Sequence, residues 1–341
     1  MFVCKKMVAL LAVTALLSLG SHVSRDARDN RSLLGCWDGC FDAPSLAMIR
    51  DASARRSHSF TSVFDRRGEA RSLLECAIQS LLYEFDRVCT GTPSDFFVEY
   101  WWRDTERIRM LEAHRDIDET LCRKVQSPVS LGSDQKVGRH RCPNFGHVLY
   151  VDVENVLAPT LVFEEEDPAD DTQRGGPPRS LKTLWSVPAY SNRLLRFCGD
   201  CLHAVSYPPL EFLDVPQKRE FPELGLKRRA VLLFNTWEKP PLYPVCGEPL
   251  VAAEEKLREM HSGRPLCRAY TSWTEADVVA PTVSDGIKLS TLSVPLLGDY
   301  SRRGCAECSL TSLVDEEKAV AALTSTSTVF GLNLHSHIDF Q

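Results

Sequence analysis

Apolar residues recur at three- and four-residue steps between Glu69 and Val88, and this period predicts an amphipathic helix. Further along the chain, short segments rich in β-branched and aromatic residues predict strands. The predicted strands are His147–Val153, Thr160–Phe163, Leu194–Phe197, Leu202–Val205 and Ala230–Phe234. The pattern therefore predicts a mainly β domain, of the α+β kind, with helical structure on its N-terminal side.

The N-terminus has the pattern of a secretory signal peptide. Lys5 and Lys6 precede an apolar run, Met7–Leu19, and small residues follow it. We place the signal at residues 1–23, with an uncleaved anchor as the alternative. The apolar run is short for a membrane span, and no later segment is long and apolar enough to cross a bilayer.

Three further regions follow the signal. Residues 24–68 are polar and predict an irregular lead-in. Residues 69–241 hold the predicted helix and strands and form the main domain, which the turn at Pro240 and Pro241 would end. Residues 242–341 predict an irregular, cysteine-containing C-terminal region.

Composition and charge narrow the class of protein. With 43% hydrophobic and 25% charged residues the chain has the make-up of a globular protein, and a net charge of −6 gives no sign of nucleic-acid binding. Of thirteen cysteines, twelve remain once Cys4 leaves with the signal, an even number that suits disulfides in an oxidising compartment. We expect a protein of the secretory pathway, in the endoplasmic reticulum lumen or secreted.

Two C-x-x-C pairs occur, Cys198/Cys201 and Cys305/Cys308. They lie too far apart for the usual spacing of a shared zinc site. Neither precedes a convincing helix N-terminus, which would lower a thiol pKa for redox chemistry. Disulfides are the simpler interpretation in a secreted chain, and their connectivity stays open.

His114, Asp116 and His203 are the candidate metal ligands. Two imidazoles and one carboxylate on one face of a metal leave three coordination positions open, which suits ferrous iron and oxygen. In an extended segment, residues two apart point the same way, so His114 and Asp116 can face one ion. The second histidine has to come from a distant strand, and His203 begins such a strand after a Gly-Asp turn.

Other histidines fit a metal site less well. His147 and Asp152 are five residues apart on one predicted strand and would face opposite sides of it. His337 and Asp339 form a second H-x-D, beside His335, but no histidine follows to complete the set.

The order of three motifs resembles that of the iron(II)- and 2-oxoglutarate-dependent oxygenases, and most of all their prolyl-hydroxylase-like branch. The motifs are His114-Arg115-Asp116, Gly199-Asp200-Cys201-Leu202-His203-Ala204-Val205, and an arginine that opens the strand Arg229–Trp237. The resemblance covers residues 70 to 241. One departure is the long gap from His203 to Arg229, which implies a loop insertion over Ser206–Lys227.

The resemblance implies a fold, a set of ligands and two cofactors. The fold is a double-stranded β-helix, the jelly-roll or cupin-like barrel, with flanking N-terminal helices. His114, Asp116 and His203 would be catalytic iron ligands, and residues 69–241 would be the oxygenase domain. Arg229 would bind the distal carboxylate of 2-oxoglutarate, with Arg228 as the alternative; strand parity favours Arg229. Ascorbate is expected beside Fe(2+) and 2-oxoglutarate.

The expected function is therefore a hydroxylase that oxidises a C–H bond of an unknown substrate, with a peptidyl side chain of a protein substrate as one candidate class. The alternative is a non-catalytic, cysteine-rich secreted barrel that acts as a binding module. A zinc hydrolase with the same ligands is a third interpretation, in which Arg229 has no evident role.

Overall fold

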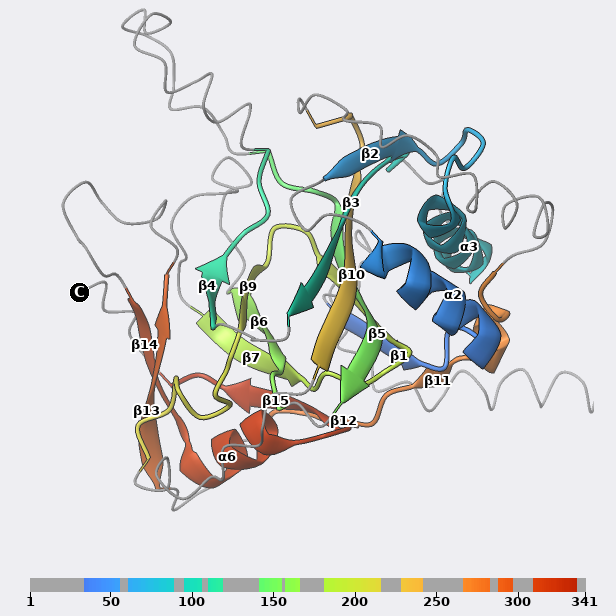
Figure 1. Ribbon diagram of the computed structural model, residues 1–341. Coiled ribbons are helices and arrows are strands. Elements are labelled where there is room, and N and C mark those ends of the chain that lie inside the picture. Colours follow the sequence, from blue (N-terminus) through green and yellow to red (C-terminus); the bar gives the residue numbers. More distant parts are fainter. Residues whose placement is uncertain are drawn as a thin grey trace, which may run out of the picture. The chain divides into compact units, whose positions relative to one another are not determined.

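The strands of the protein form two large sheets in the computed structural model shown in Figure 1. The structure describes residues 34–55, 61–88, 95–105, 110–118, 141–154, 157–165, 181–215, 228–241, 266–282, 288–296 and 309–335. The predicted signal peptide, the second C-x-x-C pair and the second H-x-D lie outside these residues. Within them, no helix combines the length and the apolar character that a bilayer crossing requires.

The larger sheet has seven strands, all antiparallel to their neighbours, in the order β11-β1-β8-β5-β10-β3-β2. Their bounds are Thr274–Glu275 (β11), Leu34–Asp38 (β1), Arg193–Cys198 (β8), Phe145–Glu154 (β5), Arg228–Trp237 (β10), Phe97–Thr105 (β3) and Ser62–Asp65 (β2).

The smaller sheet has six strands in the order β12-β15-β7-β6-β9-β4, and only the short β12–β15 pair is parallel. Their bounds are Val278–Val279 (β12), Val329–Asn333 (β15), Leu181–Val187 (β7), Thr160–Glu165 (β6), Leu202–Val205 (β9) and Leu111–His114 (β4). A separate antiparallel ribbon joins Leu289–Pro295 (β13) to Ser309–Asp315 (β14). The described helices are Ala43–Ala54 (α2), Leu73–Val88 (α3), Glu316–Thr324 (α6) and the 3₁₀ turn Tyr270–Ser272 (η4).

Each sheet buries one face in a hydrophobic cluster of its own. Leu232 and Phe234 of β10 pack with Leu149 of β5 in the cluster that also holds the apolar sides of α2 and α3. Leu161 and Phe163 of β6 pack in a second cluster, together with residues of β13, β14 and α6. Because side chains alternate along a strand, the residues between these positions lie on the opposite faces, where the two sheets meet.

Contacts between the two sheets confirm this arrangement. The Tyr150 hydroxyl of β5 lies 2.6 Å from the Thr160 hydroxyl of β6, and Arg229 of β10 donates to the same Thr160 oxygen over 3.1 Å. The predicted fold is therefore confirmed: the protein is mainly β, a jelly-roll-like sandwich of antiparallel sheets, with the N-terminal helices α2 and α3 against the larger sheet (Figure 1).

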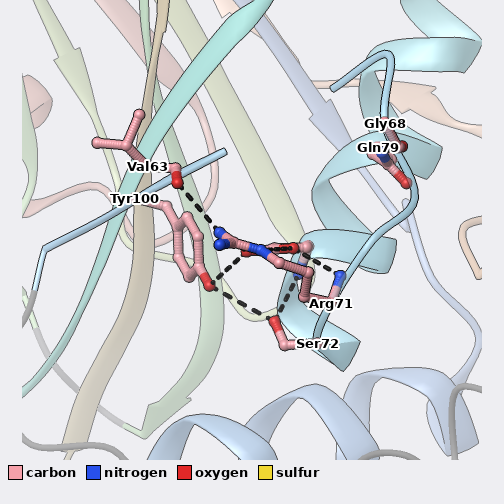
Figure 2. Close-up of polar contacts among 7 residues, drawn as sticks. Val63, Gly68, Arg71, Ser72, Gln79 and Tyr100 are labelled. Atoms are coloured by element: carbon pink, nitrogen blue, oxygen red, sulfur yellow. Dashed lines mark hydrogen bonds and ion pairs between the residues drawn. The ribbon is translucent and has the colours of Figure 1, made fainter. Parts of the chain in front are cut away.

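Helix α3, which the apolar period predicts, begins in a polar cluster. Figure 2 shows how Ser72 caps the helix: its hydroxyl accepts a hydrogen bond from the Glu75 N–H over 3.2 Å. Arg71 pairs with Glu75 over 2.7 Å and donates to the Val63 carbonyl of β2 over 3.0 Å. The Tyr100 hydroxyl of β3 also reaches the Glu75 carboxylate. The start of the helix is thus bound to two strands of the larger sheet.

Regular structure also occurs in the segments for which the sequence predicts irregular chain. Within residues 24–68, β1 pairs with β8 along its whole length, and α2 is capped by Asp42, whose side chain accepts from the Ser45 N–H over 2.8 Å. Within residues 242–341, β15 pairs with β7, and α6 adjoins it. The described part of the predicted loop insertion, residues 206–215, is held by Phe212 and Leu213, which are buried in the cluster of the smaller sheet.

Candidate metal centre

His114 and His203 lie opposite each other in the smaller sheet. His114 is the last residue of β4, His203 is the second residue of β9, and the two are paired in the antiparallel register. Their ring centroids are 4.3 Å apart. Asp116 follows two residues after His114, where the chain leaves the sheet. The structure therefore brings together all three residues that the sequence predicts as ligands.

The ligand atoms of this triad converge on one volume. The Asp116 carboxylate oxygens lie 3.9 Å from His114 Nε2 and 3.9 Å from His203 Nε2. All three ligand atoms lie within 4.8 Å of one another, and no other such group of histidine, cysteine or carboxylate side chains occurs in the described ranges. Bonds of about 2.0–2.2 Å allow ligand atoms up to about 4.4 Å apart on one ion. Three ligands on one face of an ion, with bonds at about 90° to one another, have ligand atoms about 3 Å apart, so the atoms of this triad would have to move about 1–2 Å closer to hold one ion.

Both imidazoles are oriented by backbone carbonyls. His114 Nδ1 lies 2.9 Å from the Glu112 carbonyl, and His203 Nδ1 lies 3.2 Å from the Cys201 carbonyl. A proton on each Nδ1 leaves the Nε2 lone pair facing Asp116, as metal ligation requires. Burial, followed by the neighbouring His114, lowers the pKa of His203 to about 4, while Asp116 acts in the opposite direction. The His203 ring is thus neutral at physiological pH.

Asn235 and Arg115 form hydrogen bonds that position the triad. Asn235 on β10 donates from Nδ2 to an Asp116 oxygen over 3.1 Å, so the larger sheet orients the carboxylate. Arg115, between the two ligands of the H-x-D motif, is buried and donates to the Asp200 carbonyl and to the Glu165 carboxylate. Its guanidinium thereby ties the segment after β4 to the end of β6 and to the turn that precedes β9.

A second group of polar side chains lies between the sheets. Arg229 is only 7% exposed; it donates to Thr160, and its guanidinium lies 5.4 Å from the ring centroid of Tyr150. Burial is the largest influence on Arg229 and lowers its pKa. On β6, Thr160 is two residues from Val162, which pairs with His203. Two residues along a strand span about 7 Å, so this group and the triad are neighbours on one face.

The two arginines that open β10 have different surroundings. Arg228 points away from Arg229 along the alternating strand and is half-buried between two acids. It pairs with Asp104 over 2.7 Å and with Asp152 over 3.1 Å. Arg229 thus lies between the two sheets, whereas Arg228 forms ion pairs with Asp104 and Asp152.

His147 and His335 lie apart from the triad. His147 is stacked on Phe234 at 4.3 Å and is buried on the helix-covered face of the larger sheet. The backbone of His335 pairs with Leu313 of β14. No motif in the sequence indicates a role for Tyr150, Thr160 or Asn235. Strand alternation does put Asn235 on the face of Arg229, but its contact with Asp116 depends on how the two sheets are stacked, which no local pattern encodes.

Comparisons with known proteins give only distant likenesses. No protein-family model and no curated protein matches the chain. Among solved structures, a Pseudomonas putida prolyl-4-hydroxylase has a TM-score of 0.35 and 11% identity, over 64% of this chain and 100% of that one. HygX from Streptomyces hygroscopicus has a TM-score of 0.35 and 12% identity with iron bound, over 64% of this chain and 86% of that one. With nickel and 2-oxoglutarate bound, HygX has a TM-score of 0.33 and 13% identity, over 64% and 87% of the two chains. With TM-scores below 0.5, these likenesses assign neither a fold nor a chemistry to this chain.

Proposed function

We propose that the protein is an iron(II)- and 2-oxoglutarate-dependent oxygenase that hydroxylates a C–H bond of its substrate. The observation that carries this proposal is the convergence of His114, Asp116 and His203. Two imidazoles and one carboxylate on one side of an ion are the donor set that suits ferrous iron and leaves positions open for co-substrate and oxygen. When bound, iron and 2-oxoglutarate together would supply the oxidising power for an unactivated C–H bond.

The chain's own contribution begins with orientation of the ligands. The Glu112 and Cys201 carbonyls fix the two rings, and Asn235 fixes the rotation of the Asp116 carboxylate. The carbonyl contacts raise the basicity of the two imidazoles, and all three contacts restrict the motion of the side chains. Because they come from three different strands or turns, the site is built into the sandwich and does not depend on one loop.

The polar group at Arg229 is the proposed seat of the distal carboxylate of 2-oxoglutarate. A guanidinium and hydroxyl groups are donors that a carboxylate accepts, and a guanidinium can donate two parallel hydrogen bonds. Arg229, Thr160 and Tyr150 present these donors on the face that also carries His203. A co-substrate with two ends could therefore bind between this group and the triad. Arg228 is the weaker candidate because Asp104 and Asp152 already bind it.

We also propose that residues 1–23 direct the protein to the secretory pathway and that residues 69–241 carry the chemistry. Lys5, Lys6 and the apolar run Met7–Leu19 support the first part. All three ligands and Arg229 fall within 69–241, which supports the second. A peptidyl side chain of a protein substrate remains the proposed substrate class, by analogy with the resemblance of the motifs.

The test is succinate formation by the purified protein with ferrous iron, ascorbate and 2-oxoglutarate. We expect slow, substrate-independent turnover that Asp116→Ala abolishes. The matched control is Asp51→Ala, at an exposed position of α2. Iron binding without any use of 2-oxoglutarate would favour a hydrolase, and absence of both would favour a binding module; either result would overturn the proposal.

A further inference from the structure

The turn between β8 and β9 carries a cysteine at each end. Cys198 is the last residue of β8, and Cys201 immediately precedes β9. The Cys201 N–H donates to the Cys198 carbonyl over 2.9 Å, which closes a four-residue turn. The end Cα atoms of such a turn lie within about 7 Å, and a disulfide spans about 4.4–6.8 Å between Cα atoms.

The two thiols of this turn are in contact. A side-chain hydrogen bond joins Cys198 and Cys201. Cys201 is buried and Cys198 is partly exposed, so one sulfur can be reached from solvent while the other lies behind it. Gly199 lets the turn lie flat on residue Pro143, because a Cβ at this position would overlap the Pro143 carbonyl oxygen.

The same turn supplies two carbonyl acceptors to the candidate metal centre. The Cys201 carbonyl faces His203 Nδ1 at 3.2 Å, and the Asp200 carbonyl accepts from Arg115. A change in the backbone of this turn would therefore move the carbonyl that orients His203 and the carbonyl that binds Arg115, between His114 and Asp116.

We propose that Cys198 and Cys201 form a disulfide across this turn and that the bond holds the two carbonyls in place for metal binding. The bond itself is independent of the function proposed above, whereas its effect on metal affinity rests on that function. A short covalent ring limits the conformations of the turn, and groups that orient metal ligands change affinity by about 10- to 100-fold when they are lost.

The oxidation is balanced by a small-molecule disulfide, such as oxidised glutathione. The more exposed Cys198 attacks the disulfide as its thiolate, forms a mixed disulfide and releases one glutathione thiol. The Cys201 thiolate then attacks Cys198 Sγ and releases the second. Two protons leave the protein, and the two electrons of the protein thiols reduce the glutathione disulfide.

Peptide mass analysis tests the bond directly. Trypsin would release Phe197–Lys218, which contains these two cysteines and no other. After the folded, full-length protein has been equilibrated with oxidised and reduced glutathione and its thiols alkylated, we expect this peptide two hydrogens lighter and unalkylated. Alkylation of both cysteines in the folded, oxidised protein would overturn the proposal.

Metal titration tests the coupling. We expect Co²⁺ to bind the oxidised protein about 10-fold more tightly than the protein reduced with dithiothreitol and then desalted. The double variant Cys198→Ser/Cys201→Ser should show the weaker affinity under both treatments; Cys198→Ala serves if that variant does not fold. Equal affinities in the oxidised and reduced protein, or the same loss on reduction in the variant, would overturn the coupling. Absence of Co²⁺ binding in every form would contradict the proposed function, and the peptide masses would still decide the disulfide.

Discussion

His114 and His203 pair directly across the β4–β9 ladder, and their Nε2 atoms share one carboxylate, that of Asp116. The pairing explains why residues so far apart in the sequence form one site: the register of two strands sets their separation. It also means that the site depends on backbone hydrogen bonds as much as on the three side chains.

Removal of either histidine should abolish metal binding. We expect His203→Ala and His114→Ala each to weaken Fe²⁺ or Co²⁺ binding by more than about 100-fold, since loss of an outer contact alone costs up to that factor. Equilibrium dialysis with metal analysis measures the affinity. His335→Ala, whose backbone pairs with β14, is the control and should bind as the parent protein does. Unchanged binding in the His203 variant would show that the wrong histidine has been chosen.

Arg229 should govern the affinity for 2-oxoglutarate. Hydrogen bonds to charged groups contribute about 1.5–3 kcal/mol, so Arg229→Gln should raise the KM for 2-oxoglutarate by about 10- to 150-fold with a smaller change in kcat. Arg228→Gln is the matched control, because that side chain binds Asp104 and Asp152 instead. A larger effect of the control than of the Arg229 variant would reverse the assignment.

Arg115 should act on the site through the backbone it holds. Arg115→Met removes the contacts with the Asp200 carbonyl and with Glu165. We expect metal affinity to fall by about 10- to 100-fold, with partial recovery in Arg115→Lys, which keeps the charge but not the forked geometry. Calorimetric titration with Co²⁺ measures both variants. Arg67→Met, at an exposed residue, should have no effect; a full affinity in Arg115→Met would exclude the positioning role.

His147 should make the protein less stable in mild acid. Burial, then the charge of Arg196, lowers the pKa of His147 well below its ordinary 6.5. The unfolded chain therefore takes up a proton below about pH 6.5 that the folded chain excludes, so stability falls as the pH drops below that value. Between pH 7 and pH 5 this one group should cost about 2 kcal/mol. Urea unfolding measures the free energy of unfolding at pH 7 and at pH 5. The loss of stability between these pH values should be smaller in His147→Phe than in the parent protein by about 2 kcal/mol. An equal loss in both proteins would contradict the prediction.

The antiparallel ribbon of β13 and β14 should contribute to the stability of the fold. Leu292 of β13 is 2% exposed and packs in the cluster of the smaller sheet, whereas Leu289 of the same strand is 46% exposed. Leu292→Ala should lower the free energy of unfolding by about 2–5 kcal/mol, and Leu289→Ala by less than about 0.5 kcal/mol. Chemical denaturation measures both. Equal effects would mean that the ribbon does not pack on the sheet as described.

The sequence predicts the parts of the fold whose signal is local. The period of Leu73 to Phe85 indicates α3, and the apolar runs around Val148, Leu161 and Ala204 indicate strands that are buried on both faces. The order of His114, Asp116 and His203 indicates the three candidate ligands that the structure brings together, because an H-x-D pair has a fixed spacing on extended chain.

Other elements carry no such local signal. β1 (LGCWD) mixes small, polar and aromatic residues and becomes a strand only by pairing with β8. The contact of Thr160 with both Tyr150 and Arg229 depends on how two sheets are stacked, which no spacing within one segment can show. The roles of Asn235 and Arg115 are hidden for the same reason.

The position of β4 has a consequence for the metal-free protein. β4 is the last strand in the order of the smaller sheet, whereas β9 lies between β6 and β4. On its other side β4 has, within the described residues, a single bridge, from Ala113 to Leu296, so fewer backbone hydrogen bonds hold β4 than hold β9, and local opening of β4 should cost less free energy. An ion held by all three side chains would cross-link β4, at the edge of the sheet, to β9 inside it. Amide hydrogen exchange in β4 should then slow on metal loading far more than in β9, and loading would be the final step of folding for this part of the chain.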